Sequence, residues 1–209
     1  MPSFILLDSA SPRRHEILDQ LGIAHGILRV PAPEGEDEPM LPGEAPADYV
    51  RRTARDKAVH AAAWLTSGGA PEHVPASWPA DWRSAPILCA DTTVILDDEA
   101  LGKPRDAADA ARTLRRLSGR EHAVHTAVVL AHQGKHHEAV SISTVSFQPL
   151  SEDEIAAYIA SEEPFGKAGS YAIQGRAAAF VAHLAGSHSG VMGLPAHETT
   201  QLLRALERA

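Results

Sequence analysis

Apolar residues follow two alternating patterns along this chain: short continuous runs, and longer stretches in which they recur every three to four positions. The short runs predict strands and the periodic stretches predict helices. The expected strands are residues 4–8, 25–32, 87–96, 122–130, 140–147 and 178–184, and the expected helices begin next to Pro12, Asp48, Asp106, Ser151 and Pro195. A turn at residues 133–134 would join two strands in a hairpin. This alternation of strands and helices, with one hairpin, predicts an α/β fold with a mixed sheet.

Two segments show neither pattern and are expected to be loops. Residues 33–48 are rich in Pro, Gly, Glu and Asp, which favours an exposed acidic loop. Residues 67–86 are dense in Gly, Pro and Trp, and they are too short and too interrupted to form a domain. We therefore expect one domain over residues 1–209, with residues 67–86 as a loop insertion.

Composition and charge exclude several classes of protein. The 209 residues are 44% hydrophobic, contain one cysteine and carry a formal net charge of -8. The apolar fraction suffices for a buried core, and a single cysteine cannot form an internal disulfide. The acidic balance argues against a nucleic-acid polymer or an anionic membrane as partner. The first apolar run is too short for a signal peptide and its basic residues follow it, so we expect a cytoplasmic protein.

The segment SASPRR at residues 9–14 places a turn and a helix N-terminus directly after the first expected strand. Free N–H groups, the positive end of the helix dipole and two guanidinium groups would converge there. Arginine in the first helical turn lowers helix stability unless an anion is near. We therefore expect a phosphate site that includes Ser9, Ser11, Arg13 and Arg14; the alternative is a solvated pair of surface arginines.

Asp91 interrupts the apolar run at residues 87–96 and is followed by Thr92. A buried carboxylate is costly unless it is paired, hydrogen-bonded or bound to a metal, which favours a functional role. The alternative is a carboxylate held by neighbouring backbone N–H groups. Lys57, at the edge of an apolar helix face, and Lys103, between a glycine and a proline, are candidate phosphate contacts. Lys57 could equally be a surface lysine whose stem packs on apolar side chains.

The segment FGKAGSYAIQG at residues 165–175 has three glycines, which allow a ligand to approach the backbone closely. It is no Walker A loop, because the upstream glycine and the required Ser or Thr are missing. Lys167 could contact phosphate, and the amide of Gln174 could read the edge of a base. The alternative is a structural turn.

Metal ligands are less clearly indicated. An acidic cluster could bind a hard divalent cation through one member, and spacing alone does not choose among Glu34, Glu36, Asp37 and Glu38. The twelve histidines show no zinc-site motif, so we expect surface histidines.

These segments, taken in order, resemble the Maf-like nucleoside triphosphate pyrophosphatases. The match rests on SASPRRHEIL, the DE pair at residues 37–38, ARDKA, CADTTV, LGKPRD, EPFGKAGSYAIQG and GVMGLP. The resemblance implies a fold similar to that of inosine triphosphatase: an elongated α/β molecule with a strongly curved mixed sheet, flanking helices and a cleft between two lobes. Asp8 departs from the family pattern, which usually has alanine before Ser9.

The resemblance also implies an activity, the hydrolysis of a nucleoside triphosphate to the monophosphate and pyrophosphate with a divalent metal, Mg²⁺ or Mn²⁺. It makes Asp91 the general base and Glu38 with Asp91 the metal ligands. It assigns Arg13, Arg14, Lys57 and Lys103 to the phosphates, with Lys57 and Lys103 in the catalytic group. A homodimer is a further expectation.

Three positions, Arg14, Thr92 and Gln174, separate substrate subgroups in that family, and here they resemble the dTTP/UTP branch. Two alternatives remain open. One is a pyrophosphatase acting on 7-methyl-GTP or a deaminated purine nucleotide. The other is a nucleotide-sensing regulator of septum formation with little turnover.

Overall fold

A seven-stranded mixed sheet forms the centre of the computed structural model, which describes residues 2–31 and 39–208. The strands run in the order β2-β1-β3-β5-β6-β7, and β4 pairs with β3. The β2-β1-β3 pairs are parallel and the others are antiparallel. The bounds are β1 Ile5–Asp8, β2 His25–Leu28, β3 Ile87–Leu96, β4 Glu99–Leu101, β5 Glu121–His132, β6 Lys135–Phe147 and β7 Val181–Ala185. The expected α/β fold with a mixed sheet is thus confirmed.

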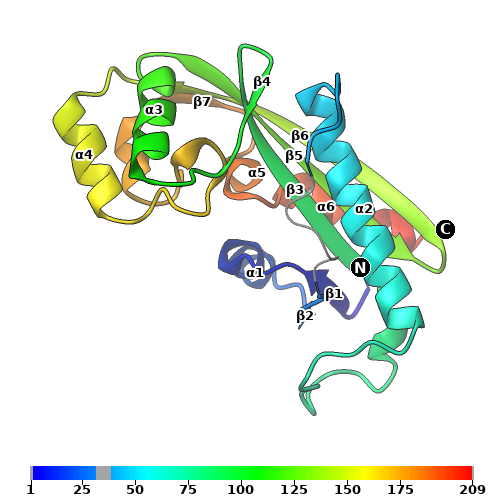
Figure 1. Ribbon diagram of the computed structural model, residues 1–209. Helices are drawn as coiled ribbons and strands as arrows, with labels where there is room; N and C mark the ends of the chain where they lie inside the picture. Colours follow the sequence, from blue (N-terminus) through cyan, green and yellow to red (C-terminus); the bar gives the residue numbers. More distant parts are fainter. Residues whose placement is uncertain (1, 32–38, 209) are drawn as a thin grey trace.

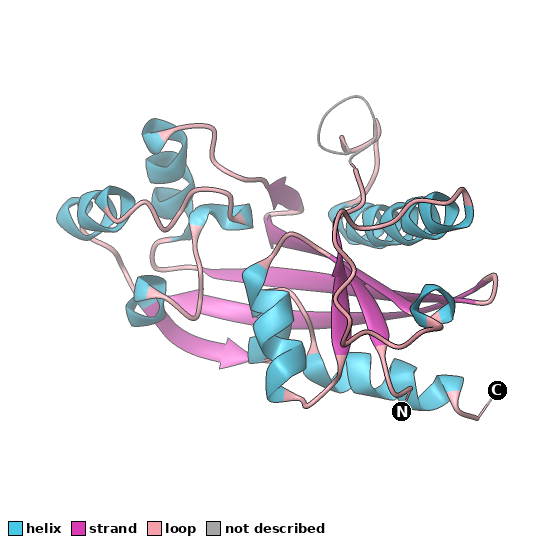
Figure 2. Cartoon of the chain, turned by 90° about the horizontal axis from the view of Figure 1, so that it is seen from below, coloured by secondary structure: helices cyan, strands magenta, loops and turns pink. Residues whose placement is uncertain are grey.

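Helices cover both faces of the sheet (Figures 1 and 2). The long helix α2 lies on one face and α6 on the other, while α3 and α4 lie together at the far end of the molecule. The bounds are α1 Pro12–Gln20, α2 Pro46–Thr66, α3 Ala107–Leu117, α4 Glu152–Ala160, α5 His188–Met192 and α6 Ala196–Leu206, with 3₁₀ turns at Trp82–Ser84, Ala168–Ser170 and Arg176–Phe180. No helix among the described residues is long and apolar enough to cross a membrane.

Local sequence signals account for most of these boundaries. Asp106 caps α3 by accepting a hydrogen bond from the Asp109 N–H, and Ser151 with Glu154 forms the expected capping box of α4. The hairpin between β5 and β6 turns at Gln133 and Gly134, as expected. Several strand boundaries were wrong. The strand expected at residues 25–32 ends at Leu28, and the one expected at residues 140–147 already begins at Lys135. Residues 178–180 belong to a 3₁₀ turn, so the last strand begins later, at Val181.

The side-chain alternation of β1 and β3 divides the core between the two faces of the sheet. Leu6 and Cys89 pack against the alanine-rich face of α2. Leu7 and Leu88 point to the opposite face and pack with residues of α1 and α6. A third cluster surrounds the later part of β3 and includes α3 and α4. The strand β3 therefore contributes to all three clusters.

The loop at residues 67–86 is attached to this core by its tryptophans. Trp78 packs against Phe4 at a centroid distance of 5.5 Å and against Trp82 at 5.2 Å. Trp78 also lies directly over Gly26 of β2, where a side chain would collide with the indole ring. The loop therefore covers the β2 edge of the sheet with aromatic side chains.

Candidate active site

The strand alternation brings Asp91 to the α2 face of the sheet, because it lies two residues after the buried Cys89. Lys57 lies on the adjoining side of α2, next to the buried Ala58. Its Nζ donates a hydrogen bond to Asp91 Oδ1 at 2.5 Å. The Asp91 side chain is only 18% exposed. A carboxylate so far removed from water needs a partner of opposite charge, and Lys57 provides it.

The Lys57–Asp91 pair lies in a cavity of about 890 Å³. Its walls come from the turn after β1, the first turn of α1, one side of α2, the middle of β3 and the loop before Tyr171. Nine of the expected site residues line it together: Ser9, Ser11, Arg13, Arg14, Lys57, Asp91, Thr92, Lys103 and Lys167. Residues from five separate parts of the chain are thus brought to one place, as the sequence predicts.

The first turn of α1 points into this cavity. Ser11 is the N-cap residue, but its side chain makes no capping bond, and its Oγ is a buried atom with no partner among the described residues. Ser11 N donates to Ser9 Oγ at 3.1 Å, which shapes the turn. A buried hydroxyl without a partner is costly in a folded protein. Together with the positive end of the helix dipole, it fits an anionic oxygen in the cavity.

Both arginines of α1 are fixed by carbonyl groups at the end of α5. Arg13 Nε donates to Met192 O at 3.1 Å, and Arg14 Nε donates to Gly193 O at 2.8 Å. Gly193 has a φ of 117°, a conformation that glycine adopts readily and other residues rarely. These bonds use the Nε atoms and leave most of the Nη hydrogens for a ligand; Arg14 Nη1 also donates to Ser9 Oγ at 3.2 Å.

Burial makes this part of the cavity electrostatically suited to an anion. The pKa values of Arg13 and Arg14 are lowered, mainly by burial. The pKa of Lys167 is also lowered, first by burial and then by the nearby charge of Arg13. Cations crowded together and partly removed from water are stabilised when an anion binds between them.

Asp8 is an acidic residue of the cavity wall that lies directly before the proposed phosphate site. Burial raises its pKa, while the Val30 N–H bond and the charges of Lys57, His60 and Arg14 act in the opposite direction. The Asp8 carboxylate lies 4.0 Å from Cys89 Sγ, on the same face of the sheet as Asp91. The cavity wall therefore contains three carboxylates, those of Asp8, Asp56 and Asp91, together with several cations.

One expected site residue is absent from the described lining of the cavity, and another lies outside the described part of the chain. Gln174 is exposed and does not line the cavity, so its contact with a base stays a prediction. Glu38 lies outside the described residues, as do the other members of the acidic cluster. Of the two expected metal ligands, Asp91 is therefore the one that the described residues place in the cavity.

Sequence reasoning did not name several lining residues, among them Arg52, His60, Tyr171 and Gly193. His60 follows Lys57 by three residues on α2, so helical spacing alone would have placed it on the same side. Gly193 belongs to the GVMGLP motif, but only the fold shows that its carbonyl holds Arg14.

The fold and the cavity define a class of protein: an α/β protein with a cation-rich cavity suited to an anion, built around a half-buried carboxylate. Comparison with known proteins agrees with that class. The family model described as "Maf-like protein" matches residues 4–206. The chain therefore belongs to the Maf-like family.

Its relatives include proteins named dTTP/UTP pyrophosphatase. The one from Bordetella pertussis is 57% identical over 204 residues, which is 98% of this chain and 93% of the relative. Those from Burkholderia thailandensis and Ralstonia nicotianae are each 50% identical, over 97% and 95% of this chain and 92% of the relative in both cases. The family resemblance stated from the sequence is thus confirmed.

Proposed function

We propose that this chain hydrolyses dTTP and UTP to the nucleoside monophosphate and pyrophosphate, in the cytoplasm. The shared name of its relatives, over nearly the whole chain, supports this choice of substrate. The observation that carries the reaction type is the cavity itself, in which cationic side chains from separate segments surround Asp91.

In this proposal Asp91 is the general base. It removes a proton from a water molecule whose oxygen bonds to the α-phosphorus. The bond from that phosphorus to the oxygen that bridges to the β-phosphorus breaks, and pyrophosphate leaves with the bonding electrons. General base catalysis of this kind contributes about 10²–10⁴-fold to a rate.

The cations bind and orient the triphosphate. Arg13 and Arg14 are held by carbonyl groups of the α5 end, so their guanidinium groups need little reorganisation to bind phosphate oxygens. Lys57 holds the Asp91 carboxylate in place before substrate binds, and Lys57 itself lines the cavity. Lys103 and Lys167 also line the cavity and add to its cationic wall.

A divalent cation belongs to the proposal, with Mg²⁺ as the first choice and Mn²⁺ as the second. The donor set fits such an ion, because Asp91 and Asp8 both offer carboxylate oxygens to the cavity. When bound, the cation neutralises charge on the triphosphate and polarises a phosphoryl oxygen. Glu38 remains a predicted ligand beside Asp91.

The direct test is pyrophosphate release from dTTP, UTP, dCTP, GTP, ITP and 7-methyl-GTP with Mg²⁺. We expect the highest kcat/KM on dTTP and UTP, and a higher value on a purine nucleotide would overturn the substrate choice. Asp91→Asn should lower kcat by about 10²–10⁴-fold. Asp98→Asn, at an exposed turn outside the cavity, is the matched control and should leave kcat unchanged. Tight nucleotide binding without hydrolysis would favour the regulator instead.

A further inference from the structure

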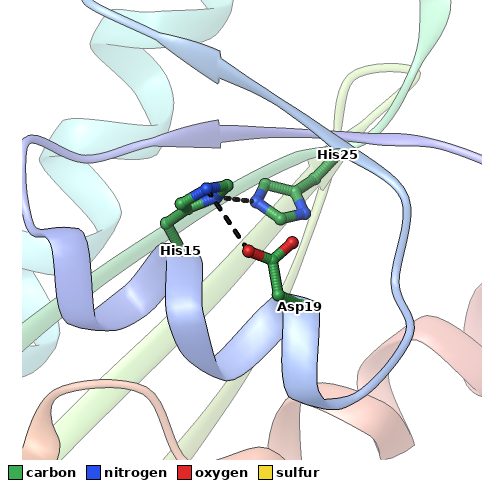
Figure 3. Close-up of side chains that lie close together, drawn as sticks. All are labelled: His15, Asp19 and His25. Atoms are coloured by element: carbon green, nitrogen blue, oxygen red, sulfur yellow. Dashed lines mark hydrogen bonds and ion pairs between the residues drawn. The ribbon is translucent and has the colours of Figure 1, made fainter.

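Three potential metal ligands meet on the outer side of α1, away from the cavity. His15 and Asp19 are four residues apart on α1, so they lie on one face of the helix. After α1 the chain turns at Gly22, which has a φ of 66°, and returns along β2 with His25 beside them. Figure 3 shows the three side chains converging. None of them lines the cavity described above.

The hydrogen bonds of the cluster fix how its nitrogens point. His25 Nδ1 lies 2.8 Å from Ile23 O, an acceptor, so Nδ1 carries a hydrogen. A neutral His25 therefore directs the lone pair of Nε2 toward His15, whose Nδ1 is 2.5 Å away. A backbone carbonyl that fixes one imidazole nitrogen and leaves the other for a metal is a common arrangement in metal sites.

The other side of His15 faces a carboxylate. His15 Nε2 lies 3.3 Å from Asp19 Oδ2. Asp19 is in the last turn of α1, where the helix dipole disfavours a negative charge, and that turn contains no basic residue. The two imidazoles and the carboxylate thus direct more lone pairs toward one another than they have N–H donors to match. A cation bound between them would accept these lone pairs.

We propose that His15, Asp19 and His25 bind a borderline divalent metal ion of the Zn²⁺ type, which links α1 to β2. One ligand atom from each residue can be chosen so that all three lie within 4.8 Å of one another. Tetrahedral coordination at Zn–N distances near 2.0 Å needs nitrogens about 3.3 Å apart. Rotations of the His15 and Asp19 side chains would bring the ligand atoms to that spacing, and their exposed fractions of 43% and 60% leave room for these rotations.

The ligand types select the class of metal. Imidazole nitrogens suit Zn²⁺, Ni²⁺ and Co²⁺, whereas Mg²⁺ prefers oxygen donors and keeps its waters. With three protein ligands and exposed side chains, water completes the coordination. The site is thus chemically distinct from the cavity, where carboxylate oxygens are the candidate donors.

The test is calorimetric titration of the full chain with ZnCl₂, in an Asp91→Asn background that weakens metal binding in the cavity. We expect one Zn²⁺ per chain, a loss of at least about tenfold in affinity with His25→Gln, and a similar loss with His15→Gln. Asp19 is exposed, so Asp19→Asn carries little risk of misfolding. This substitution should also weaken Zn²⁺ binding. His136→Gln, at an exposed hairpin position, is the matched control and should bind as the background does.

A second measurement uses Co²⁺ and its visible absorption. Co²⁺ held by two imidazoles in a tetrahedral site absorbs visible light much more strongly than hexaaqua Co²⁺ does. We expect this band with the background protein and not with its His25→Gln derivative. Equal Zn²⁺ affinity in all variants, or a Co²⁺ spectrum unchanged by His25→Gln, would overturn the proposal.

Discussion

Acidification to pH 5 should destabilise this protein through one buried histidine, His122 on β5. The side chain is 3% exposed, and the sequence analysis had expected histidines at the surface. Its Nε2 hydrogen-bonds to the hydroxyl of Tyr171 at 2.9 Å, and its Nδ1 has no partner among the described residues. Burial lowers the pKa of His122 from 6.5 to about 4, since the protonated ring would lose its hydration.

The sign and size of the effect follow from that pKa. The unfolded chain binds a proton at His122 as the pH falls through 6.5, whereas the folded chain does not until the pH approaches 4. The contribution to stability is therefore complete above pH 6.5 and is lost as the pH falls. Between pH 7 and pH 5 the loss is about 2 kcal/mol, and it reaches about 3 kcal/mol below the folded pKa. For a chain of this length, 2 kcal/mol lowers Tm by about 4–8 °C.

Urea unfolding at pH 7 and pH 5, followed by tryptophan fluorescence, measures this loss. Other groups also titrate in this range, so the decisive quantity is the difference between the wild type and His122→Gln. Glutamine cannot ionise and can still hydrogen-bond to Tyr171, so the variant should lose about 2 kcal/mol less than the wild type. His183→Gln, at an exposed position of β7, is the matched control. Equal losses for the wild type and His122→Gln would refute the reasoning.

Three further predictions concern the cavity. Asp8→Asn should raise the urea midpoint at pH 7, because the raised pKa of Asp8 means that its contribution to stability is present below its unfolded pKa of 3.8 and is lost as pH rises through the folded value. An unchanged urea midpoint contradicts this. Arg14→Lys removes the 2.8 Å bond to Gly193 O and should raise KM by about tenfold or more, measured by steady-state kinetics, and an unaltered KM counts against the clamp. Gly169→Ala should lower the free energy of unfolding by about 1–3 kcal/mol, since φ is 68° and the new Cβ would lie 2.8 Å from a β3 side chain. Gly166→Ala has a similar φ but open space, so urea unfolding should show a smaller loss, and equal losses would exclude the steric cause.

The sequence predicted the parts of the fold that local signals determine. The caps of α3 and α4 and the turn of the β5–β6 hairpin depend on residues close together in the chain, and all were found as expected. The short strand β4 and the helix α5 were not predicted. The turn before β4 places Asp97 and Asp98 at positive φ, and α5 has only five residues, so neither has a strong local pattern.

For the site, the sequence predicted nine of the residues that come together, but not how they are held. The motifs around Arg14, Lys57 and Asp91 were enough to expect a common cavity. The bond from Arg14 to Gly193 joins residues 179 positions apart, and no local pattern encodes it. The burial of His122 was also missed, because the alternation of β5 does not show which cluster covers it.

The strand β3 ties all three core clusters together mechanically. Its hydrogen bonds to β5 continue from Ile87 to Ile95 without a break, and β5 in turn pairs with β6 along its full length. Asp91 lies in the middle of this ladder, so no flexible joint separates the two walls of the cavity on the β3 side. A change in the width of the cavity therefore requires elastic twisting of the long strands. Substitutions that stiffen or loosen the ladder far from the cavity should then alter how tightly its two walls approach each other.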